Sequence, residues 1–251
     1  MLDARNTSPE IGRSRPDIAV FGIGAIEQHS VHLPVGTDWL GISDDTRRVA
    51  EKLDAFLVPS LPFSMSQCHG PMAGTIWLKP QTLAAVVRDT VMSLYAQGFR
   101  RVLILNGHGG NFVLEAEIRE LNQTYAGLIV LMPQFLLPRP GDPKIFDHPE
   151  GIHANEGETA HQMYINGEHV KEERVDFMPA VGREFLDYAF IGFICEWGAW
   201  GYPSFGTKEK GEMAAKLNAG RIAEWARETF ARVEALKSVP DGAGLASGQG
   251  A

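Results

Sequence analysis

Apolar and polar residues follow one another along this chain in blocks that predict strands alternating with helices. Short apolar runs have the length of buried strands at residues 17–21, 55–58, 101–105 and 127–132. Between two of them, apolar residues recur every three or four positions over residues 80–97, a helical spacing that Gly98 ends. We predict further helices over residues 42–53, 112–125 and 208–236, and one that begins near Glu156.

This alternation predicts an α/β protein with a mostly parallel central sheet. The helix over residues 80–97 and the strand over 101–105 complete a βαβ unit, in which the two strands run parallel. We place one domain over residues 1–239. The tail over residues 240–251 is rich in Gly, Ala and Ser, which predicts disorder.

Composition narrows the classes of function. The chain has 251 residues, of which 44% are hydrophobic and 22% charged, enough to bury the core of one domain. A net charge of −8, without a long run of Lys or Arg, argues against a nucleic-acid partner and favours a small molecule. No apolar run approaches the roughly 20 residues of a membrane span. With only two cysteines, the chain fits a reducing compartment, and we expect a cytoplasmic location.

The first chemical block follows the strand over residues 17–21. Glu27, His29 and Asp38 therefore lie at the carboxyl end of that strand, where open α/β sheets bind ligands. Glu27 and His29 are two positions apart and would point to the same side of an extended segment, and the turn residues at 34–37 could fold Asp38 back onto them. Imidazole and carboxylate together favour zinc, manganese or iron as the metal.

Two later blocks also stand where an element begins or ends. His108 lies in Asn106-Gly-His-Gly-Gly-Asn111, between a strand and a helix, where Gly109 and its neighbours let backbone N–H groups converge on a ligand. In the third block, Asn155 and Glu158 have the spacing of a capping box at the start of a helix. That reading leaves the carboxylate of Glu156 free for another role.

The first block also carries a family resemblance. Gly24-Ala-Ile-Glu-Gln-His29 and His32-Leu-Pro-Val-Gly-Thr-Asp38 resemble the signature of the creatininase family, which includes creatinine amidohydrolase, formamide hydrolases and a mycofactocin-maturing peptidase. With the later blocks, the resemblance covers about residues 17 to 230. It implies a three-layer α/β/α fold and a metal-dependent amidohydrolase. Ser30 departs from the family pattern, which usually has Gly there.

The resemblance also implies a set of metal ligands. Asp38 would bridge two divalent ions, with Glu27 and His108 on one ion and His29 and Glu156 on the other. Creatinine amidohydrolases carry a ligating Glu two residues after the imidazole that matches His108, where this chain has Gly110. We therefore assign the missing carboxylate to Glu156, and the departure weakens the case for creatinine as substrate.

The expected reaction is hydrolysis of a C–N amide bond in a small cyclic amide, such as a lactam or a creatinine-like ring, or in a formamide. A hydroxide that bridges the two metal ions would attack the carbonyl carbon. His153 suits a proton shuttle to the leaving nitrogen, and we assign it to catalysis together with Glu156. We expect His69, Gly109, Trp39 and Trp77 to contact the substrate. We expect His32 and Glu158 to contact the metal ligands and hold them in position.

Two other functions stay open. The chain could be a peptidase on a modified peptide, like the relative that matures mycofactocin, or a metal-binding protein without catalysis. The full set of ligands argues against a metal-binding protein without catalysis. An open groove at the site would favour the peptidase. The resemblance also suggests a homo-oligomer, with a hexamer favoured, in which the aromatic segment 185–205 lies between subunits.

Overall fold

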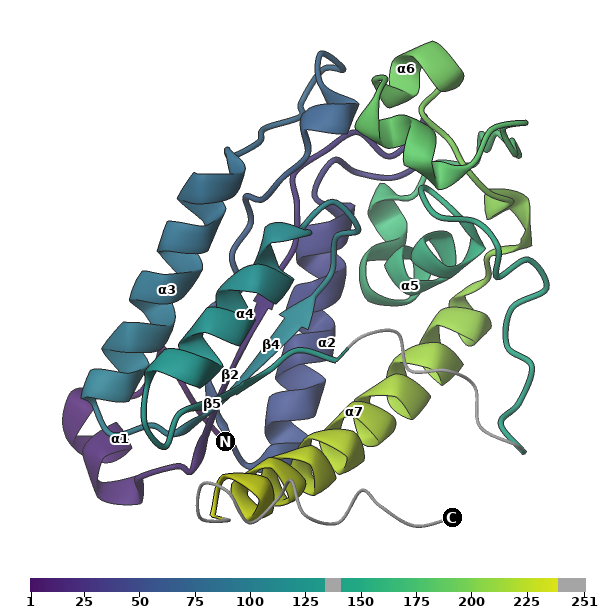
Figure 1. The fold of residues 1–251 in the computed structure, drawn as a ribbon. Helices are drawn as coiled ribbons and strands as arrows, with labels where there is room; N and C mark the ends of the chain where they lie inside the picture. The colour runs from purple at the N-terminus through teal and green to yellow at the C-terminus, as the bar shows by residue number, and fades with distance from the viewer. Residues whose placement is uncertain (134–140, 239–251) are drawn as a thin grey trace, which may run out of the picture.

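A five-stranded parallel sheet forms the centre of the protein (Figure 1), as seen in a computed structural model that describes residues 1–133 and 141–238. Its strands lie in the order β1-β3-β2-β4-β5, and every neighbouring pair runs parallel. The prediction of a mostly parallel sheet is therefore confirmed. In chain order the strands are β1 (Leu2–Asp3), β2 (Ile18–Ile23), β3 (Phe56–Leu57), β4 (Arg101–Asn106) and β5 (Ile129–Leu131).

The helices agree with the predicted pattern to within a few residues, with one shift that matters. They are α1 (Ser8–Ser14), α2 (Thr37–Leu53), α3 (Pro80–Ala96), α4 (Val113–Thr124), α5 (Glu156–Asn166), α6 (Ile191–Ile194) and α7 (Lys208–Lys237). Four 3₁₀ turns complete the described elements: η1 (Gln67–His69), η2 (Gly167–His169), η3 (Arg183–Asp187) and η4 (Pro203–Phe205). Helix α2 begins at Thr37, not at Ile42 as predicted, and so its first turn contains Asp38.

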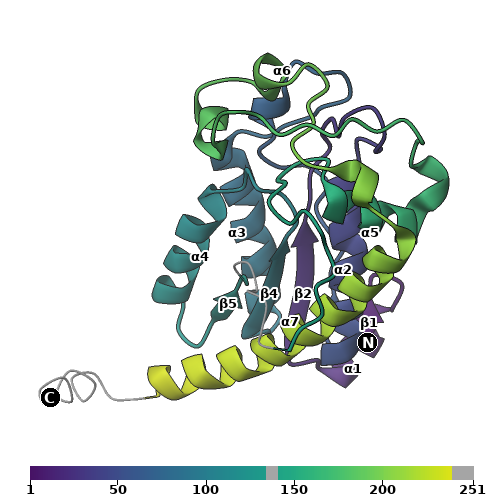
Figure 2. The same cartoon turned by 90° about the vertical axis from the view of Figure 1, so that its right-hand side faces the viewer.

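Helices cover both faces of the sheet. Figures 1 and 2 show α3 and α4 on one face and α2 and α7 on the other, which confirms the three-layer α/β/α fold. Strand β2 serves both layers, because Phe21 and Ile23 pack in the core under α3 and α4, while Ile18 and Val20 pack in the core under α2 and α7. A strand buried on both faces is apolar at every position, which is why β2 stands out in the sequence.

Helix α5 lies beyond the carboxyl end of the sheet, beside α2 and α7 (Figure 1). The predicted capping box starts it: Asn155 Oδ1 accepts from the Glu158 backbone N–H, and Glu158 Oε2 accepts from that of Asn155. An ion pair then ties α5 to the first turn of α7. Lys210 Nζ contacts the fully buried Glu156 carboxylate and also donates to Asp147 Oδ2 at 2.7 Å.

Two other expectations bear on the whole chain. The single domain over residues 1–239 stays a prediction, and the tail over residues 240–251, expected to be disordered, lies outside the described residues. Among the described helices, none combines the length and the apolar character that crossing a membrane requires.

The ion pair between α5 and α7 gives a test of stability. We expect Lys210→Met to lower the free energy of unfolding by about 3 kcal/mol, because it leaves the buried Glu156 carboxylate without its cation. Lys208→Met removes an exposed lysine from the same helix turn and should stay within about 0.5 kcal/mol of the parent. Urea unfolding of the chelator-treated proteins measures both values. Equal losses in the two variants would contradict this role of Lys210.

Candidate metal centre

Five segments bring their polar side chains together beyond the carboxyl ends of β2 and β4. The loop after β2 and the first turn of α2 contribute Glu27, His29 and Asp38, and the loop after β4 contributes His108. These four predicted ligands lie together in the structure. Two further segments add side chains to the same cluster: His69 from η1, and His153 and Glu158 from the start of α5.

Asp38 stands between two imidazoles. Its Oδ1 lies 3.0 Å from His29 Nε2, and its Oδ2 lies 3.0 Å from His108 Nδ1. The predicted turn before Asp38 is present, since the Thr37 backbone N–H donates to the Pro34 carbonyl at 3.0 Å. One carboxylate thus faces a ring from the loop after β2 with one oxygen and a ring from the loop after β4 with the other.

Backbone carbonyls orient three imidazoles of the cluster in the same way. In each ring, the outer nitrogen is the one that points away from the carboxylates, and the inner nitrogen points toward them. Each can donate an N–H from its outer nitrogen to a backbone carbonyl oxygen: His29 to Glu27 at 3.1 Å, His108 to Met65 at 2.9 Å and His153 to Gln28 at 2.7 Å. With the proton on the outer nitrogen, the inner nitrogen of a neutral ring directs a lone pair at the carboxylates. Metal-binding histidines are oriented by hydrogen bonds of this kind.

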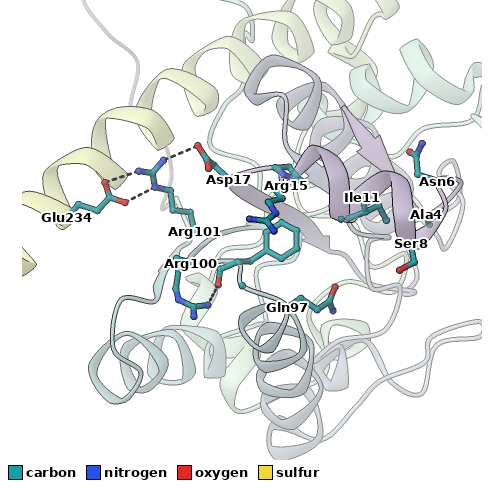
Figure 3. Close-up of a pocket in the computed structure, with 14 residues that line it drawn as sticks. Ala4, Asn6, Ser8, Ile11, Arg15, Asp17, Gln97, Arg100, Arg101 and Glu234 are labelled. Atoms are coloured by element: carbon teal, nitrogen blue, oxygen red, sulfur yellow. Dashed lines mark hydrogen bonds and ion pairs between the residues drawn. The ribbon is translucent and has the colours of Figure 1, made fainter.

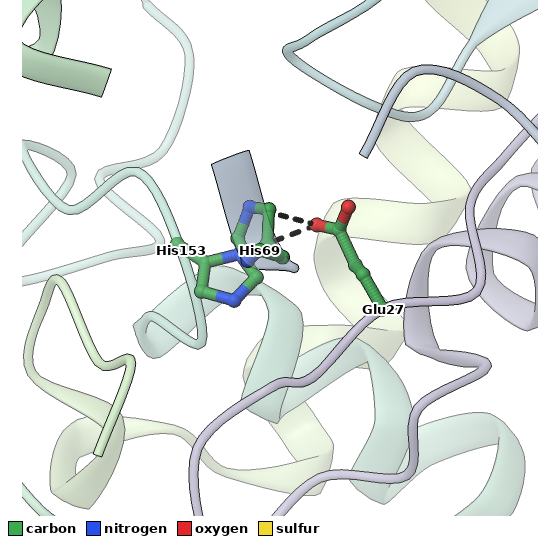
Figure 4. Close-up of side chains that lie close together, drawn as sticks. All are labelled: Glu27, His69 and His153. Atoms are coloured by element: carbon green, nitrogen blue, oxygen red, sulfur yellow. Dashed lines mark ion pairs between the residues drawn. The ribbon is translucent and has the colours of Figure 1, made fainter. Parts of the chain in front are cut away.

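Glu27 is the buried carboxylate at the middle of the cluster. Three ring nitrogens surround its Oε1: His108 Nδ1 at 3.3 Å, His69 Nε2 at 3.4 Å and His153 Nδ1 at 3.6 Å. Figure 4 shows the rings of His69 and His153 turned toward this one oxygen. Among the residues that the structure describes, neither Glu27 oxygen has a partner with hydrogen-bond geometry. A buried carboxylate without hydrogen bonds is costly, and a bound cation would satisfy it.

The electrostatics of the cluster favour positive charge between the carboxylates. Burial lowers the pKa of His29, but the Asp38 carboxylate outweighs burial and raises that pKa to about 10. Burial also lowers the pKa of His108, which Glu27 and Asp38 nevertheless raise well above its ordinary value. The donor set of carboxylates and imidazoles suits zinc, manganese or iron, and the residues present therefore fit such a metal ion.

The structure places the two glutamates of α5 differently from the prediction. Glu156, predicted as a ligand and a catalytic residue, points away from the cluster: it pairs with Lys210 and accepts from the backbone N–H groups of Asp147 and His148. Glu158 lies with His29 and His153, with one donor atom of each within 4.8 Å of the others. Burial raises the pKa of Glu158 to about 7, and the neighbouring His29 partly offsets that rise.

Gly110 lies where a side chain has no room. A Cβ atom at this position would lie 2.5 Å from His108 Nε2 and 2.5 Å from the Met65 carbonyl oxygen. Any side chain there would clash with both atoms of the hydrogen bond that orients His108. The position where the family resemblance implies a ligating Glu is thus closed to a side chain in this arrangement.

The residues expected around the substrate occupy different places. His69 belongs to the cluster itself, and its pKa is lowered to about 4, chiefly by burial. Trp77 is half exposed and its ring lies against Gly70, next to His69, whereas the Trp39 indole donates to the Ser60 carbonyl at 3.3 Å. The Gly109 carbonyl accepts from Arg183 Nη2 at 2.5 Å.

His32 lies next to the cluster and contacts the first turn of α5. Its Nε2 lies 2.9 Å from the Thr159 hydroxyl, next in the chain to Glu158. Burial lowers the pKa of His32 to about 4, and the Arg174 cation adds to the effect. A neutral His32 therefore braces the first turn of α5 without adding charge to the site.

A separate group of possible ligands lies between α2 and α5, made of Asp44, Asp45 and His161. Both Asp44 oxygens are already paired, one with Arg47 at 2.8 Å and the other with Arg48 at 2.5 Å. Because these arginines supply the positive charge, the group has no need of a metal ion. Within residues 1–133 and 141–238, the Glu27 carboxylate is paired with imidazoles and with no lysine or arginine.

A cavity of about 1000 Å³ lies at the opposite end of the sheet, around α1 and the start of β4 (Figure 3). Arg101 in its wall pairs with Glu234 at 2.6 Å and lies 3.9 Å from Asp17. Its lining includes no histidine, and its Arg100 donates to the backbone carbonyls of Tyr95 and Phe99. Among the described residues, this cavity therefore lacks the mixture of imidazoles and carboxylates that the cluster has.

Comparison with known proteins relates the chain to one family. The family model described as "Creatininase: Creatinine amidohydrolase" matches residues 4–226. A creatinine amidohydrolase of Pseudomonas putida is 28% identical over 240 residues, which cover 85% of this chain and 90% of that protein. A mycofactocin precursor peptide peptidase of Mycobacterium tuberculosis is 31% identical over 115 residues, 42% of this chain and 45% of that protein.

Solved structures show the same fold. A Bacteroides fragilis protein, provisionally described as a creatinine amidohydrolase, superposes with a TM-score of 0.74 at 27% identity, over 90% of this chain and 95% of its own. A creatininase variant of "Zn-Zn type" superposes with a TM-score of 0.77 at 24% identity, over 91% of this chain and 98% of its own.

The two glutamates of α5 provide the test of the site. We expect Glu158→Gln to lower the metal content of the purified protein, because it removes a negative charge from the cluster. Glu156→Gln should keep the parent's metal content and lose stability instead, since that carboxylate faces Lys210. Elemental analysis of protein purified without chelators compares the two. Metal loss in Glu156→Gln alone would restore the role predicted from the sequence.

Proposed function

This chain belongs to the creatininase family, and we propose that it hydrolyses a C–N amide bond of a small cyclic amide or a formamide with the help of two divalent metal ions. The observation that carries the proposal is the buried cluster around Glu27. Among the described residues its carboxylate lacks a hydrogen-bond partner, and it faces imidazoles that backbone carbonyls orient. Such a site is built for cations. Its place at the carboxyl ends of parallel strands is the usual place for a ligand.

The residues divide into two ligand sets that share Asp38. Glu27 and His108 would hold one ion and His29 and Glu158 the other, since each Asp38 oxygen faces one of the two imidazoles. When bound, zinc, manganese or iron would polarise the amide carbonyl and lower the pKa of a water molecule. The protein's own part is to hold these side chains in place and to exclude bulk water, because every one of the four predicted ligands is buried.

His153 is the residue best placed to move a proton. Its Nδ1 faces the cluster, while its Nε2 donates to the Gln28 carbonyl. Burial lowers the pKa of His153 well below its ordinary value, and the neighbouring His29 and His69 add to the effect. A neutral ring with its lone pair on Nδ1 can take a proton during attack on the amide and return it to the leaving nitrogen.

A peptidase is the second candidate. Its support is the 31% identity to the mycofactocin precursor peptide peptidase, although this match covers less than half of either chain. The reaction would use the same cluster, since both substrates present an amide carbonyl. The two candidates differ in the length of chain that the site must admit.

Hydrolysis of a substrate panel tests this function. We expect the metal-loaded protein to hydrolyse at least one lactam, hydantoin or formamide, to stop when a chelator is added, and to recover with zinc or manganese. His153→Ala should lower kcat by about 10²–10⁴-fold while the metal content is kept, and His169→Ala, at an exposed histidine, should leave both unchanged. Cleavage of peptides alone would replace the small-amide proposal with the peptidase.

We also propose that the protein is a homo-oligomer, with a hexamer favoured. The segment expected between subunits exposes several aromatic side chains in the isolated chain: Phe185, Tyr188, Phe190, Phe193, Trp197 and Phe205. Tyr188 and Phe193 are each 81% exposed, far more than a single chain in water favours for large aromatic groups. Burial between subunits would remove this surface from water.

Light scattering tests this assembly. We expect the molar mass at micromolar concentration to be a multiple of 27.5 kDa, and six times that value for the hexamer. Tyr188→Glu combined with Phe193→Glu should reduce the mass, because charges in the interface would lose their hydration. A parent protein of monomer mass would contradict the proposal.

A further inference from the structure

His69 differs from the other three imidazoles of the cluster in the hydrogen-bond partner of its outer nitrogen. The outer nitrogens of His29, His108 and His153 each face a carbonyl oxygen, which can only accept. The outer nitrogen of His69, Nδ1, lies 2.9 Å from the side-chain amide nitrogen of Gln28, which can only donate. His69 Nδ1 therefore accepts, and its proton belongs on Nε2, the nitrogen that faces Glu27.

The orientation of the Gln28 amide decides this assignment, and two groups hold it. Gln28 Oε1 accepts from the Ser30 backbone N–H at 3.0 Å, and Gln28 Nε2 lies 3.3 Å from the Gly198 carbonyl oxygen. Turning the amide over would lose the bond from Ser30 and place two oxygens face to face. Ser30 has a φ of 59°, in the left-handed region of backbone conformations. Glycine, the usual residue of the family at this position, adopts that region without steric cost.

Gln28 also holds His153, with a different atom. The His153 Nε2–H donates to the Gln28 backbone carbonyl at 2.7 Å, and so the 3.0 Å approach of the Gln28 amide nitrogen to the same Nε2 brings two donors together. One residue thus sets opposite tautomers in two neighbouring rings, whose centroids are 4.3 Å apart and whose planes are tilted by 49°. His153 turns a lone pair toward Glu27 Oε1, and His69 turns an N–H toward it.

We propose that Gln28 is a positioning residue that fixes His69 as an N–H donor to the Glu27 carboxylate, so that His69 orients a metal ligand and is not one itself. This rests on the proposed metal site. Figure 4 shows the geometry it explains, with two rings directed at one oxygen. A lone pair is suited to share a cation with Glu27, and an N–H is suited to hold the carboxylate at the angle that cation needs.

Zinc affinity of two His69 variants tests the role of the ring. His69→Ala removes the donor and should weaken zinc binding by about 10–100-fold, the loss typical of a partner behind a ligand. His69→Gln keeps an N–H donor near the position of Nε2 and should bind zinc about as tightly as the parent. Competition with a chromophoric chelator gives both constants, and His169→Gln is the control for the substitution itself. Equal zinc loss in both His69 variants would make His69 a ligand.

The tautomer itself can be observed by ¹⁵N NMR of histidine-labelled, zinc-loaded protein. We expect a proton on Nε2 of His69 and none on its Nδ1. Gln28→Glu replaces the donor by an acceptor of the same shape, and it should bring a proton to His69 Nδ1. Gln123→Glu adds the same charge on the exposed side of α4 and should leave the His69 signals unchanged.

The outcomes separate this proposal from the proposed function. A zinc-bonded Nε2, or a proton on Nδ1 in the parent protein, overturns the role of Gln28 even if amides are hydrolysed. A parent that binds zinc but hydrolyses none of the amides contradicts the proposed function, while the His69 tautomer is still measured.

Discussion

The contact of Asp38 with two imidazoles is the constraint on which the rest of the site depends. Its two oxygens join a ring from the loop after β2 to a ring from the loop after β4, each at 3.0 Å. A carboxylate that is almost fully buried has to be matched by positive charge. The fold meets this need by running β2 and β4 parallel and side by side, so that both loops leave the sheet at the same end.

The second requirement is that α5 be held in one orientation. Its two acidic residues serve this purpose in different ways, because Glu156 is bound to Lys210 on α7 while Glu158 closes the capping box and still lies near His29 and His153. The buried pair with Lys210 costs desolvation, and in return it fixes which side of α5 faces the cluster. The capping bond uses only Glu158 Oε2, so structural and metal-binding roles can coexist in one carboxylate.

The parts that could be predicted from the sequence are those that local patterns decide. Strands β2 and β4 are continuous apolar runs because both faces are buried, and α3 shows its buried side every three or four residues. Strand β1 and helix α1 were missed because one has two residues and the other buries none. The choice between Glu156 and Glu158 depends on tertiary packing. Two residues that are two positions apart on a helix point in directions that differ by about 200° around its axis. Nothing local says which of these two directions faces the metal.

Gly110 shows how a change at one position is linked to the others. In this chain the Met65 carbonyl occupies the space that a side chain at position 110 would need, and it orients His108 through Nε2. A carboxylate at position 110 and a hydrogen bond from His108 to Met65 therefore exclude each other. Losing the first leaves room for the second, and a carboxylate can then be supplied from across the cluster by Glu158, which lies with His29 and His153. The metal site is in this sense one electrostatic unit, in which the position of each carboxylate depends on how the opposite imidazole is held.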